Sequence, residues 1–243
     1  MHHEIIRLEE VDSTNNYLRS LSLTDEEQML VAVARHQTAG RGQGRNTWES
    51  EAGKNLLFSV KIKPRNIAIA NQFLLSMTMA LAIKRALDLR ADGFSLKWPN
   101  DIYWHDYKVS GTLIETTLSG SAINSCIFGI GIDVNQTTFL SDAPNPLSLC
   151  SITGHSEDCD LLLSDILHSF DSLYSQLAGG DSEAIIAQYH DALYRHTGFH
   201  KYHDKLGEFE AEIVRVEPNG RLVLSDTESR IRQYYFKEVE FVL

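Results

Sequence analysis

Residues that could hold an anion gather in the stretch 36-HQTAGRGQGRNTWES-50. Three glycines and two arginines fall between Gly40 and Arg45, and Trp48 follows them. Glycines at this density let a backbone approach a ligand closely or swing between open and closed forms, and guanidinium groups among them favour an anionic ligand. The stretch lacks the Gly-Lys-Ser/Thr of a P-loop, and an arginine replaces the last glycine of a dinucleotide fingerprint. We interpret it either as an ordinary surface turn or as a flap whose N–H groups and Arg41 close over a phosphate or carboxylate.

A second polar cluster is 97-KWPNDIYWHDYKVSG-111. It contains, in order, Lys97, Trp98, Asn100, Asp101, Trp104 and Lys108. Because Pro99 fixes its own backbone and favours an extended residue before it, Asn100 and Asp101 are expected at a strand end in a defined orientation. Asp101 could bind Mg²⁺ on a nucleotide or anchor a nearby cation, and the Lys108 ammonium group could reach a phosphate in a cleft. The alternative interpretation is solvent exposure for the lysines and core packing for the two tryptophans.

A third element is 129-GIGIDVN-135, in which small residues alternate with isoleucine before Asp133 and Asn135. Glycines weaken a strand unless something lies against its backbone. We therefore expect a flat ring or a phosphate against Gly129 and Gly131, with a tight sheet crossing as the alternative.

Hydrophobic periodicity predicts the elements that must position these groups. Buried or alternating strands are predicted at 29–35, 55–62, 94–98, 108–118 and 125–134. Ser13 is a plausible N-cap of a first helix, and helical spacing runs from Ile69 to Leu87 and recurs at 163–177 and 185–193.

The pattern changes near Leu206, where short alternating segments are separated by turns at 218–220 and 225–229. Strands at roughly ten-residue spacing predict a small β-barrel. We place the boundary in the polar linker 196–207, which divides the chain into residues 1–203 and 204–243. The histidines of this linker lie among charged residues without a nearby cysteine, so we do not interpret them as zinc ligands.

Composition limits the compartment and the partners. The net charge of −11 argues against a general affinity for nucleic acid or an anionic membrane. No apolar run approaches the roughly 20 residues of a membrane span, and residues 1–12 lack the apolar core of a signal peptide. Three cysteines without CxxC spacing indicate free thiols in a reducing compartment, so we expect a cytoplasmic protein.

Together these residues resemble the biotin protein ligases, which attach biotin to a lysine of a carboxylase carrier domain. The shared motifs are Ser13-Thr14-Asn15, Gln37 with Gly40-Arg41-Gly42, Trp48, Lys97-Trp98-Pro99-Asn100-Asp101, Lys108 with Gly111, and Gly129-Ile130-Gly131. The resemblance covers nearly the whole chain. It implies an α+β catalytic domain, with a mixed sheet flanked by helices related to class II aminoacyl-tRNA synthetases and lipoate ligases, and a C-terminal SH3-like β-barrel.

The resemblance also implies the chemistry and a role for each motif residue. Biotin would be activated as biotinyl-5'-AMP at the expense of ATP with its Mg²⁺, then transferred to the carrier lysine. The catalytic residues would be Lys108, Arg41 and Asp101. Biotin would contact Ser13, Thr14, Asn15, Gln37, Gly40, Arg41, Gly42, Gln43, Lys108 and Gly111. The nucleotide side would comprise Arg45, Trp48, Lys97, Trp98, Asn100, Asp133 and Asn135.

The chemistry explains why such a site needs cations and closure. Joining a carboxylate to an α-phosphate brings two anions together, so their repulsion must be offset by Lys108, Arg41 and Mg²⁺. The mixed anhydride is hydrolysable, so a closing loop that excludes water protects it. The carrier lysine must then attack as a neutral amine, and Asp101 could orient that amine or accept its proton.

Two positions depart from the family pattern. After Gly42 the family usually continues with Gln or Arg, then Arg-Gly, whereas this chain has Gln43-Gly44-Arg45. The strand that commonly ends Gly-Ile-Asn here ends in Asp133. A carboxylate near phosphates repels them unless Mg²⁺ bridges the two, so Asp133 is expected either to ligate the metal or to point away.

Two alternative functions remain at this point. A lipoate–protein ligase shares the fold and the adenylate chemistry, but hydrogen-bonding side chains such as Thr14 and Gln37 suit the ureido ring of biotin better than a dithiolane. A non-catalytic biotin or nucleotide regulator would not need Arg41, Lys108 and Asp101 together. Because the motifs begin within the first 15 residues, we expect a ligase without an N-terminal DNA-binding domain. Its expected partners are biotin, ATP and a biotin carboxyl-carrier domain, without nucleic acid or membrane, and a homodimer is compatible with the resemblance.

Overall fold

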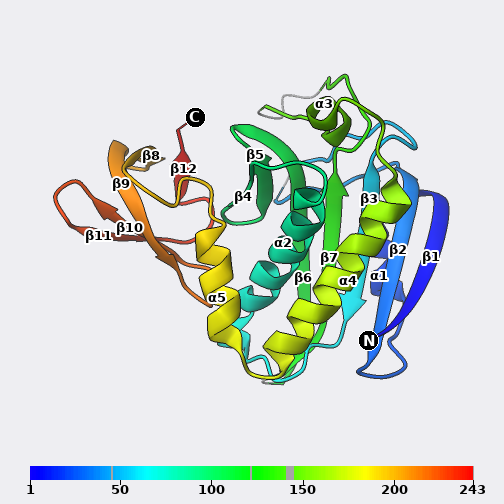
Figure 1. Cartoon of the computed structure of the whole chain (residues 1–243). Coiled ribbons are helices and arrows are strands. Elements are labelled where there is room, and N and C mark those ends of the chain that lie inside the picture. Colours follow the sequence, from blue (N-terminus) through cyan, green and yellow to red (C-terminus); the bar gives the residue numbers. More distant parts are fainter. Residues whose placement is uncertain (45, 121, 141–144, 243) are drawn as a thin grey trace.

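The fold is built on a large mixed β-sheet (Figure 1). The computed structural model describes residues 1–44, 46–120, 122–140 and 145–242. The seven strands lie in the order β1-β2-β3-β7-β6-β5-β4. Their bounds are β1 (His2–Val11), β2 (Gln28–Gln37), β3 (Leu56–Ile62), β4 (Phe94–Lys97), β5 (Asp101–Trp104), β6 (Tyr107–Ser119) and β7 (Ala122–Ile132). β1 pairs in parallel with β2 and all other neighbours are antiparallel, so the predicted mixed sheet is confirmed.

Helices cover both faces of this sheet. Three long helices pack against one another on one face, namely α2 (Phe73–Asp88), α4 (Cys159–Ala178) and α5 (Ser182–Asp191). The short α1 (Thr14–Ser20) contacts β2, β3 and β7 on the other face, and α3 (Leu149–Thr153) and the 3₁₀ turn η1 (Ile69–Asn71) complete the set. None of the helices in the described ranges is long and apolar enough to cross a membrane.

The alternation of side chains along β2 shows how the two faces arise. Met29 and Val31 point into the main core beside the three long helices, whereas Leu30 and Ala32 join Leu18 of α1 in a smaller cluster. Successive residues of a strand point to opposite faces. A fully buried strand therefore serves both layers, which is why 29–35 reads as a continuous apolar run.

Most of the predicted elements are confirmed. The five predicted strands correspond to β2, β3, β4, β6 and β7, and the predicted helices to α1, α2, α4 and α5. Ser13 lies at the N-cap of α1, although its side chain makes no capping hydrogen bond. The prediction missed β1 and β5: β1 is a largely exposed edge strand without a clean apolar alternation, and β5 has only four residues between two turns.

The C-terminal residues form a second, antiparallel sheet in the order β11-β10-β9-β8-β12. Its strands are β8 (His200–Asp204), β9 (Gly207–Val216), β10 (Leu222–Asp226), β11 (Ile231–Tyr234) and β12 (Val239–Phe241). This sheet fits the predicted SH3-like domain, although its described strands do not close into a barrel. Within the described residues, β11 pairs only with β10 and β12 only with β8, because these two short strands lie at opposite edges. The predicted boundary after residue 203 falls inside β8, and the two-domain division stays a prediction.

The motif around Pro99 joins the two sheets. Trp98 is buried in the main core, and its indole Nε1 donates to the carbonyl oxygen of Gly220 over 2.9 Å. The N–H of Phe73, at the start of α2, donates to Pro218 over 3.1 Å. A Cβ atom at Gly220 would lie 2.9 Å from the Phe73 ring, so this turn packs directly on α2.

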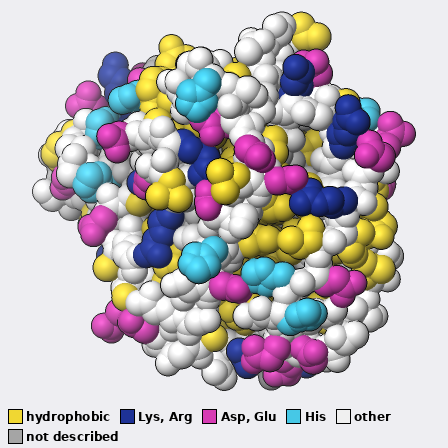
Figure 2. Space-filling model, turned by 45° about the vertical axis from the view of Figure 1, so that its right-hand side comes forward, with side chains coloured by type: hydrophobic (Ala, Val, Ile, Leu, Met, Phe, Trp, Pro, Cys, Tyr) yellow, Lys and Arg dark blue, Asp and Glu magenta, His cyan; other side chains and the backbone are white. Residues whose placement is uncertain are grey.

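The molecular surface carries mixed charge. Figure 2 shows acidic and basic side chains interspersed over one face, with hydrophobic side chains gathered in one area. A pocket of about 330 Å³ lies between β1 and α4. The charged groups at this pocket pair across it, His3 with Asp171 and Arg7 with Asp160, each over 2.7 Å. These contacts fasten the edge strand to α4.

Strand β3 holds α1 at both ends. The Ser59 hydroxyl oxygen lies 2.6 Å from Thr14 Oγ1 and 2.6 Å from Asn15 Oδ1, at the beginning of the helix. The Lys61 ammonium group donates to the carbonyl oxygens of Leu18, over 3.0 Å, and Leu21, at the end. Lys61 is only 7% exposed, and burial lowers its pKa. Because Ser59 and Lys61 are two residues apart, they project from the same face of the strand.

We predict that Lys61→Met destabilises the protein by about 1–3 kcal/mol, because two carbonyl oxygens lose their donor while the apolar stem is kept. The measurement is the urea midpoint of unfolding. Lys63→Met is the matched control, because Lys63 lies two residues further along the chain and forms only a half-exposed ion pair with Glu26. Its expected effect is below about 0.5 kcal/mol. Equal midpoints for the two variants would contradict the role given to Lys61.

Candidate active site

The candidate active site lies on the face of the large sheet that carries α1. Two neighbouring rows of residues, in register across the strands, form its floor. One row is Ala34, Leu57, Gly131, Gly111, Asp101 and Lys97, and the next is Ala32, Ser59, Gly129 and Leu113. Residues in register on adjacent strands share a face, and rows two residues apart share it too. Small residues in both rows let other parts of the chain lie directly on the strand backbone on this side of the sheet. We call this floor, and the space above it, the recess.

At one end of the recess, α1 lies directly on the bare backbone of β7. A Cβ atom at Gly129 would be 2.2 Å from Asn15 Oδ1. The Thr14 N–H and hydroxyl both donate to Gln37 Oε1, over 2.8 and 3.1 Å. Ser13, Thr14 and Asn15 are all buried. The structure thus brings together the polar residues predicted to contact biotin, and only glycine at position 129 permits this approach.

At the other end, the Trp48 indole lies across β6 and β7. A Cβ atom at Gly131 would be 2.4 Å from the indole, and one at Gly111 would be 3.0 Å from it. The Lys108 ammonium nitrogen is 5.8 Å from the centre of a Trp48 ring. The buried indole Nε1 has no hydrogen-bond partner among the described residues. A flat ring was expected against the strand glycines, and here the chain supplies that ring itself.

The glycine-rich loop is a small hairpin that carries Trp48 to this position. The N–H of Trp48 donates to Gly40 over 3.0 Å, and that of Gly42 donates to Asn46 over 2.8 Å. A Cβ atom at Gly40 would be 2.8 Å from the Trp48 carbonyl oxygen. Gly44 has a φ of +71°, in the left-handed region that glycine tolerates best. The hairpin thus places Trp48 over the sheet, while Arg41, Gly44, Asn46 and Thr47 are exposed.

Arg41 extends from this hairpin toward α1. Its guanidinium group donates to Asn16 Oδ1 over 3.3 Å and lies 3.4 Å from Glu115 Oε1. Gln43 lies in the same hairpin, where its carbonyl oxygen accepts from the N–H of Asn46 over 3.3 Å. Arg45, predicted on the nucleotide side, lies outside the described residues.

Two residues at this site were missed by the sequence predictions. Ser59 bonds to the beginning of α1, and Glu115 accepts from Asn15 Nδ2 over 3.0 Å. Both signals were present in the sequence: a serine interrupts the apolar strand 55–62, and Glu115 is four residues after Gly111, on the same face of β6. Only the pairing of β3, β6 and β7 shows that these faces meet.

Lys108 and Asp101 form an ion pair beside Trp48. The ammonium nitrogen is 2.7 Å from Asp101 Oδ1, and both side chains are mostly buried. Asn100 anchors the preceding turn, because its side-chain amide donates to Thr112 O over 2.7 Å while its own carbonyl oxygen accepts from the Thr112 N–H. The structure therefore brings Lys108, Asp101, Gly111 and Trp48 together.

The other predicted nucleotide-side residues in this motif face the C-terminal sheet. The Lys97 ammonium group donates to the Tyr103 hydroxyl over 3.0 Å and lies 5.4 Å from the Phe241 ring. Burial lowers the pKa of Lys97, and Asp101 opposes that effect. The Trp98 indole N–H donates to the carbonyl oxygen of Gly220, as described above. The structure does not bring Trp98 to the Lys108–Asp101 pair.

Asp133 is a buried carboxyl group, 4% exposed, at the end of β7. Burial raises its pKa to about 8, although nearby Lys108 favours the charged form. Asn55 Nδ2 donates to Asp133 Oδ1 over 3.1 Å and to Gln136 Oε1 over 2.9 Å. Asn135 points elsewhere: its amide bonds to the backbone of Glu157, before α4.

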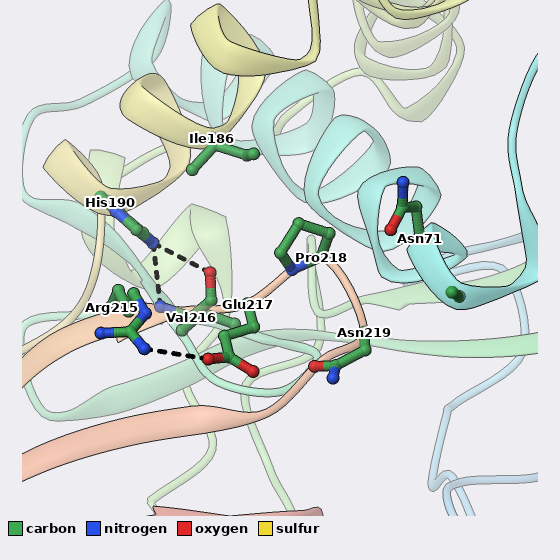
Figure 3. Close-up of a pocket in the computed structure, with 9 residues that line it drawn as sticks. Asn71, Ile186, His190, Arg215, Val216, Glu217, Pro218 and Asn219 are labelled. Atoms are coloured by element: carbon green, nitrogen blue, oxygen red, sulfur yellow. Dashed lines mark hydrogen bonds and ion pairs between the residues drawn. The ribbon is translucent and has the colours of Figure 1, made fainter. Parts of the chain in front are cut away.

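The pocket in Figure 3 is separate from this site. It has a volume of about 550 Å³ and is lined by Ile186 and His190 of α5 and by the end of β9 with the turn that follows. His190 Nε2 accepts from the Val216 N–H over 2.9 Å, and Arg215 pairs with Glu217 over 3.0 Å. Its polar groups are thus paired with one another, and none of the predicted site residues lines it.

Comparison with known proteins identifies the family of the chain. The sequence model described as "Biotin/lipoate A/B protein ligase family" matches residues 8–133, and the chain belongs to this family. The "Bifunctional ligase/repressor BirA" of Bacillus spizizenii is 27% identical over 247 residues, covering 99% of this chain and 74% of that protein. The "Biotin--[acetyl-CoA-carboxylase] ligase" of Paracoccus denitrificans is 32% identical over 152 residues, covering 60% of this chain and 62% of that protein.

Solved structures share the whole fold. The biotin protein ligase from Aquifex aeolicus in complex with biotin and ATP superimposes with a TM-score of 0.80 and 27% identity, covering 98% of this chain and 99% of that one. The biotin protein ligase from Leishmania major in complex with biotinyl-5-AMP has a TM-score of 0.66 and 24% identity over 95% of this chain and 98% of that one, and shows the fold alone. These likenesses confirm the resemblance inferred from the motifs.

We predict that Gly131→Ala displaces the Trp48 indole, because the new methyl group would lie 2.4 Å from it. Displacement into water should shift the tryptophan emission maximum to longer wavelength. The same substitution in a Trp48→Phe background is the control, and there it should leave the emission unchanged. An unshifted spectrum for Gly131→Ala alone would show that the indole is not seated on this glycine.

A second prediction concerns pH. The Asp133 carboxyl group keeps its proton up to about pH 8 in the folded state but loses it near pH 4 when unfolded, so stability should fall as pH rises between these values. Asp133→Asn removes this dependence. The free energy of unfolding of the variant should therefore rise relative to that of the wild type, by at most about 1.4 kcal/mol per pH unit in that window, and the difference should stay constant above it. Urea unfolding of both proteins from about pH 5 to pH 9 measures the difference. Parallel stability profiles would exclude a raised pKa.

Proposed function

We propose that the protein is an ATP-dependent ligase that activates biotin as biotinyl-5'-AMP and transfers it to a lysine of a biotin carboxyl-carrier domain, as found in acetyl-CoA carboxylase. The observation that carries the proposal is one recess, flanked by the polar beginning of α1 at one end and by the Lys108–Asp101 pair at the other, with Arg41 beside it. It is supported by the likeness of the whole chain to a ligase solved with biotin and ATP.

The end of the recess at α1 suits the ureido ring of biotin. Thr14, Asn15 and Gln37 already form hydrogen bonds there, so a ligand with both donors and acceptors can join the network without leaving a buried polar group unpaired. A dithiolane ring offers neither kind of group. This chemistry favours biotin over the lipoate alternative.

The end of the recess at Lys108 and Asp101 suits the activation of the biotin carboxylate. An oxygen of the biotin carboxylate attacks the α-phosphorus of ATP, a carbonyl–oxygen–phosphorus linkage forms, and the bond to the β-phosphate breaks to release pyrophosphate. In the structure, Lys108 forms an ion pair with Asp101, and Arg41 forms one with Glu115. In the reaction they would instead neutralise substrate oxygens, which offsets the repulsion between the two anions.

Mg²⁺ would accompany ATP as part of the substrate complex and neutralise its phosphates. The Asp133 carboxyl is an oxygen donor of the kind that Mg²⁺ prefers, and it lies near enough to Lys108 to feel its charge. Because its pKa is raised by burial, a cation bound there would release its proton. The residues present therefore fit the metal in type.

The hairpin that carries Trp48 would exclude water from the adenylate. A substrate laid against Gly111 and Gly131 must either displace the indole or stack on its outer face, because the indole already covers both glycines. After activation, Asp101 would orient the carrier lysine as a neutral amine for attack on the anhydride carbon, and AMP would leave. The three cysteines are free, which supports the cytoplasm as the location.

The test is mass spectrometry of a biotin carboxyl-carrier domain after incubation with the protein, biotin and MgATP. We expect one biotinyl group on one lysine, at a rate reduced at least about 100-fold by Lys108→Ala, since removing one stabilising donor costs about that much. Lys63→Ala, which changes a lysine at the far end of β3, should leave the rate unchanged.

Two other outcomes would reassign the protein. A lipoyl group added from lipoate and MgATP, with no biotin transfer, would make it a lipoate ligase. Tight binding of biotin or ATP without pyrophosphate release or modification of the carrier would make it a non-catalytic regulator.

A further inference from the structure

Two arginines converge on the same pair of oxygen atoms at the edge of the site. Arg19, in the last turn of α1, donates to Glu115 Oε1 over 2.7 Å and to Asn16 Oδ1 over 3.3 Å. Arg41, from the glycine-rich hairpin, lies 3.4 Å from the same Glu115 oxygen and donates to the same Asn16 oxygen over 3.3 Å. The shorter contact with the carboxylate belongs to Arg19.

Positive charges outnumber negative charges in this cluster. Glu115 carries one negative charge for two guanidinium groups, and its other oxygen, Oε2, accepts from Asn15. When Arg41 moves to an anionic substrate, it must leave Glu115. The Glu115 side chain is only 25% exposed. If no other cation were nearby, the departure of Arg41 would be costly, because separating a partly buried ion pair leaves an uncompensated charge. Arg19 removes this obstacle, since it stays on Glu115 after Arg41 has gone.

We infer that Arg19 is a positioning residue for substrate binding: it neutralises Glu115 and so leaves Arg41 available to the carboxylate of the substrate. The inference rests on the proposed function, in which Arg41 contacts biotin. α1 then serves the site twice, because its first turn contributes Thr14 and Asn15 while its last turn sets the charge balance around Arg41.

Two simpler effects of Arg19 must be separated from this one. A cation in the last turn of a helix stabilises that helix, and any positive charge near the site attracts an anion. Neither effect requires Glu115. The proposed effect exists only while Glu115 is charged, so a double-mutant cycle with Glu115→Gln distinguishes it.

The experiment measures the KM for biotin, the KM for ATP and kcat in carrier biotinylation for Arg19→Met, Glu115→Gln and the double variant. Arg19→Met should raise the KM for biotin roughly two- to fivefold, the effect expected of a partly exposed ion pair, with kcat at saturation and the KM for ATP unchanged. In the Glu115→Gln background the same substitution should have no effect. Arg7→Met is the control, because the Arg7 side chain is exposed to a similar extent as Arg19 and also makes a 2.7 Å ion pair, with Asp160, away from the site.

An unchanged KM for biotin in Arg19→Met, or an equal rise in both backgrounds, would overturn the inference. If Arg19→Met lowers the thermal midpoint by more than about 5 °C, Arg19→Gln takes its place in the same cycle. Failure of the wild-type protein to biotinylate the carrier would instead reject the proposed function, so the two failures are distinguishable.

Discussion

The whole candidate site depends on the absence of Cβ atoms at three positions of two paired strands. Asn15 lies where a side chain at Gly129 would be, and Trp48 lies where side chains at Gly111 and Gly131 would be. Glycines weaken a strand, and here β3 and β6 flank β7 on both sides and supply the missing stability through continuous pairing. The recess therefore exists because a strand in the middle of a seven-stranded sheet can tolerate bare backbone.

Helix α1 lies directly on this part of the sheet, although it has only seven residues and could not be stable alone. Its position comes from β3, which bonds to its beginning through Ser59 and to its end through Lys61. A buried ammonium group is expensive unless hydrogen-bonded, so Lys61 indicates that the orientation of α1 is closely specified. Fold and function are thus linked by the same short helix.

The ionisable side chains of the candidate site are paired with one another or kept neutral in the structure. The two principal cations of the site are each paired with a carboxylate, Lys108 with Asp101 and Arg41 with Glu115, and its deepest carboxyl group, Asp133, keeps its proton in the neutral range. In the proposed function, an anionic substrate would enter by exchanging one set of ion pairs for another, which would limit the desolvation of each cation. The C-terminal sheet is attached to this region through the turn between β9 and β10. Trp98 donates to Gly220 of that turn, and Phe73 of α2 donates to Pro218.

Hydrophobic periodicity predicted most of the strands and helices, because it is a local property of the chain. The class of fold followed from the motifs shared with a known family. The sequence also predicted a flat ring or a phosphate against Gly129 and Gly131, whereas the structure has the Trp48 ring on Gly131 and the Asn15 side chain on Gly129. Only the tertiary structure decided that this ring is Trp48, that Trp98 serves the C-terminal sheet, that Asn135 points to α4, and that Glu115 and Ser59 belong to the site. It likewise decided that the C-terminal sheet stays open and that the edge strand β1 exists. The side-chain contacts among these join residues from 22 to 122 positions apart in the chain, which no local pattern connects.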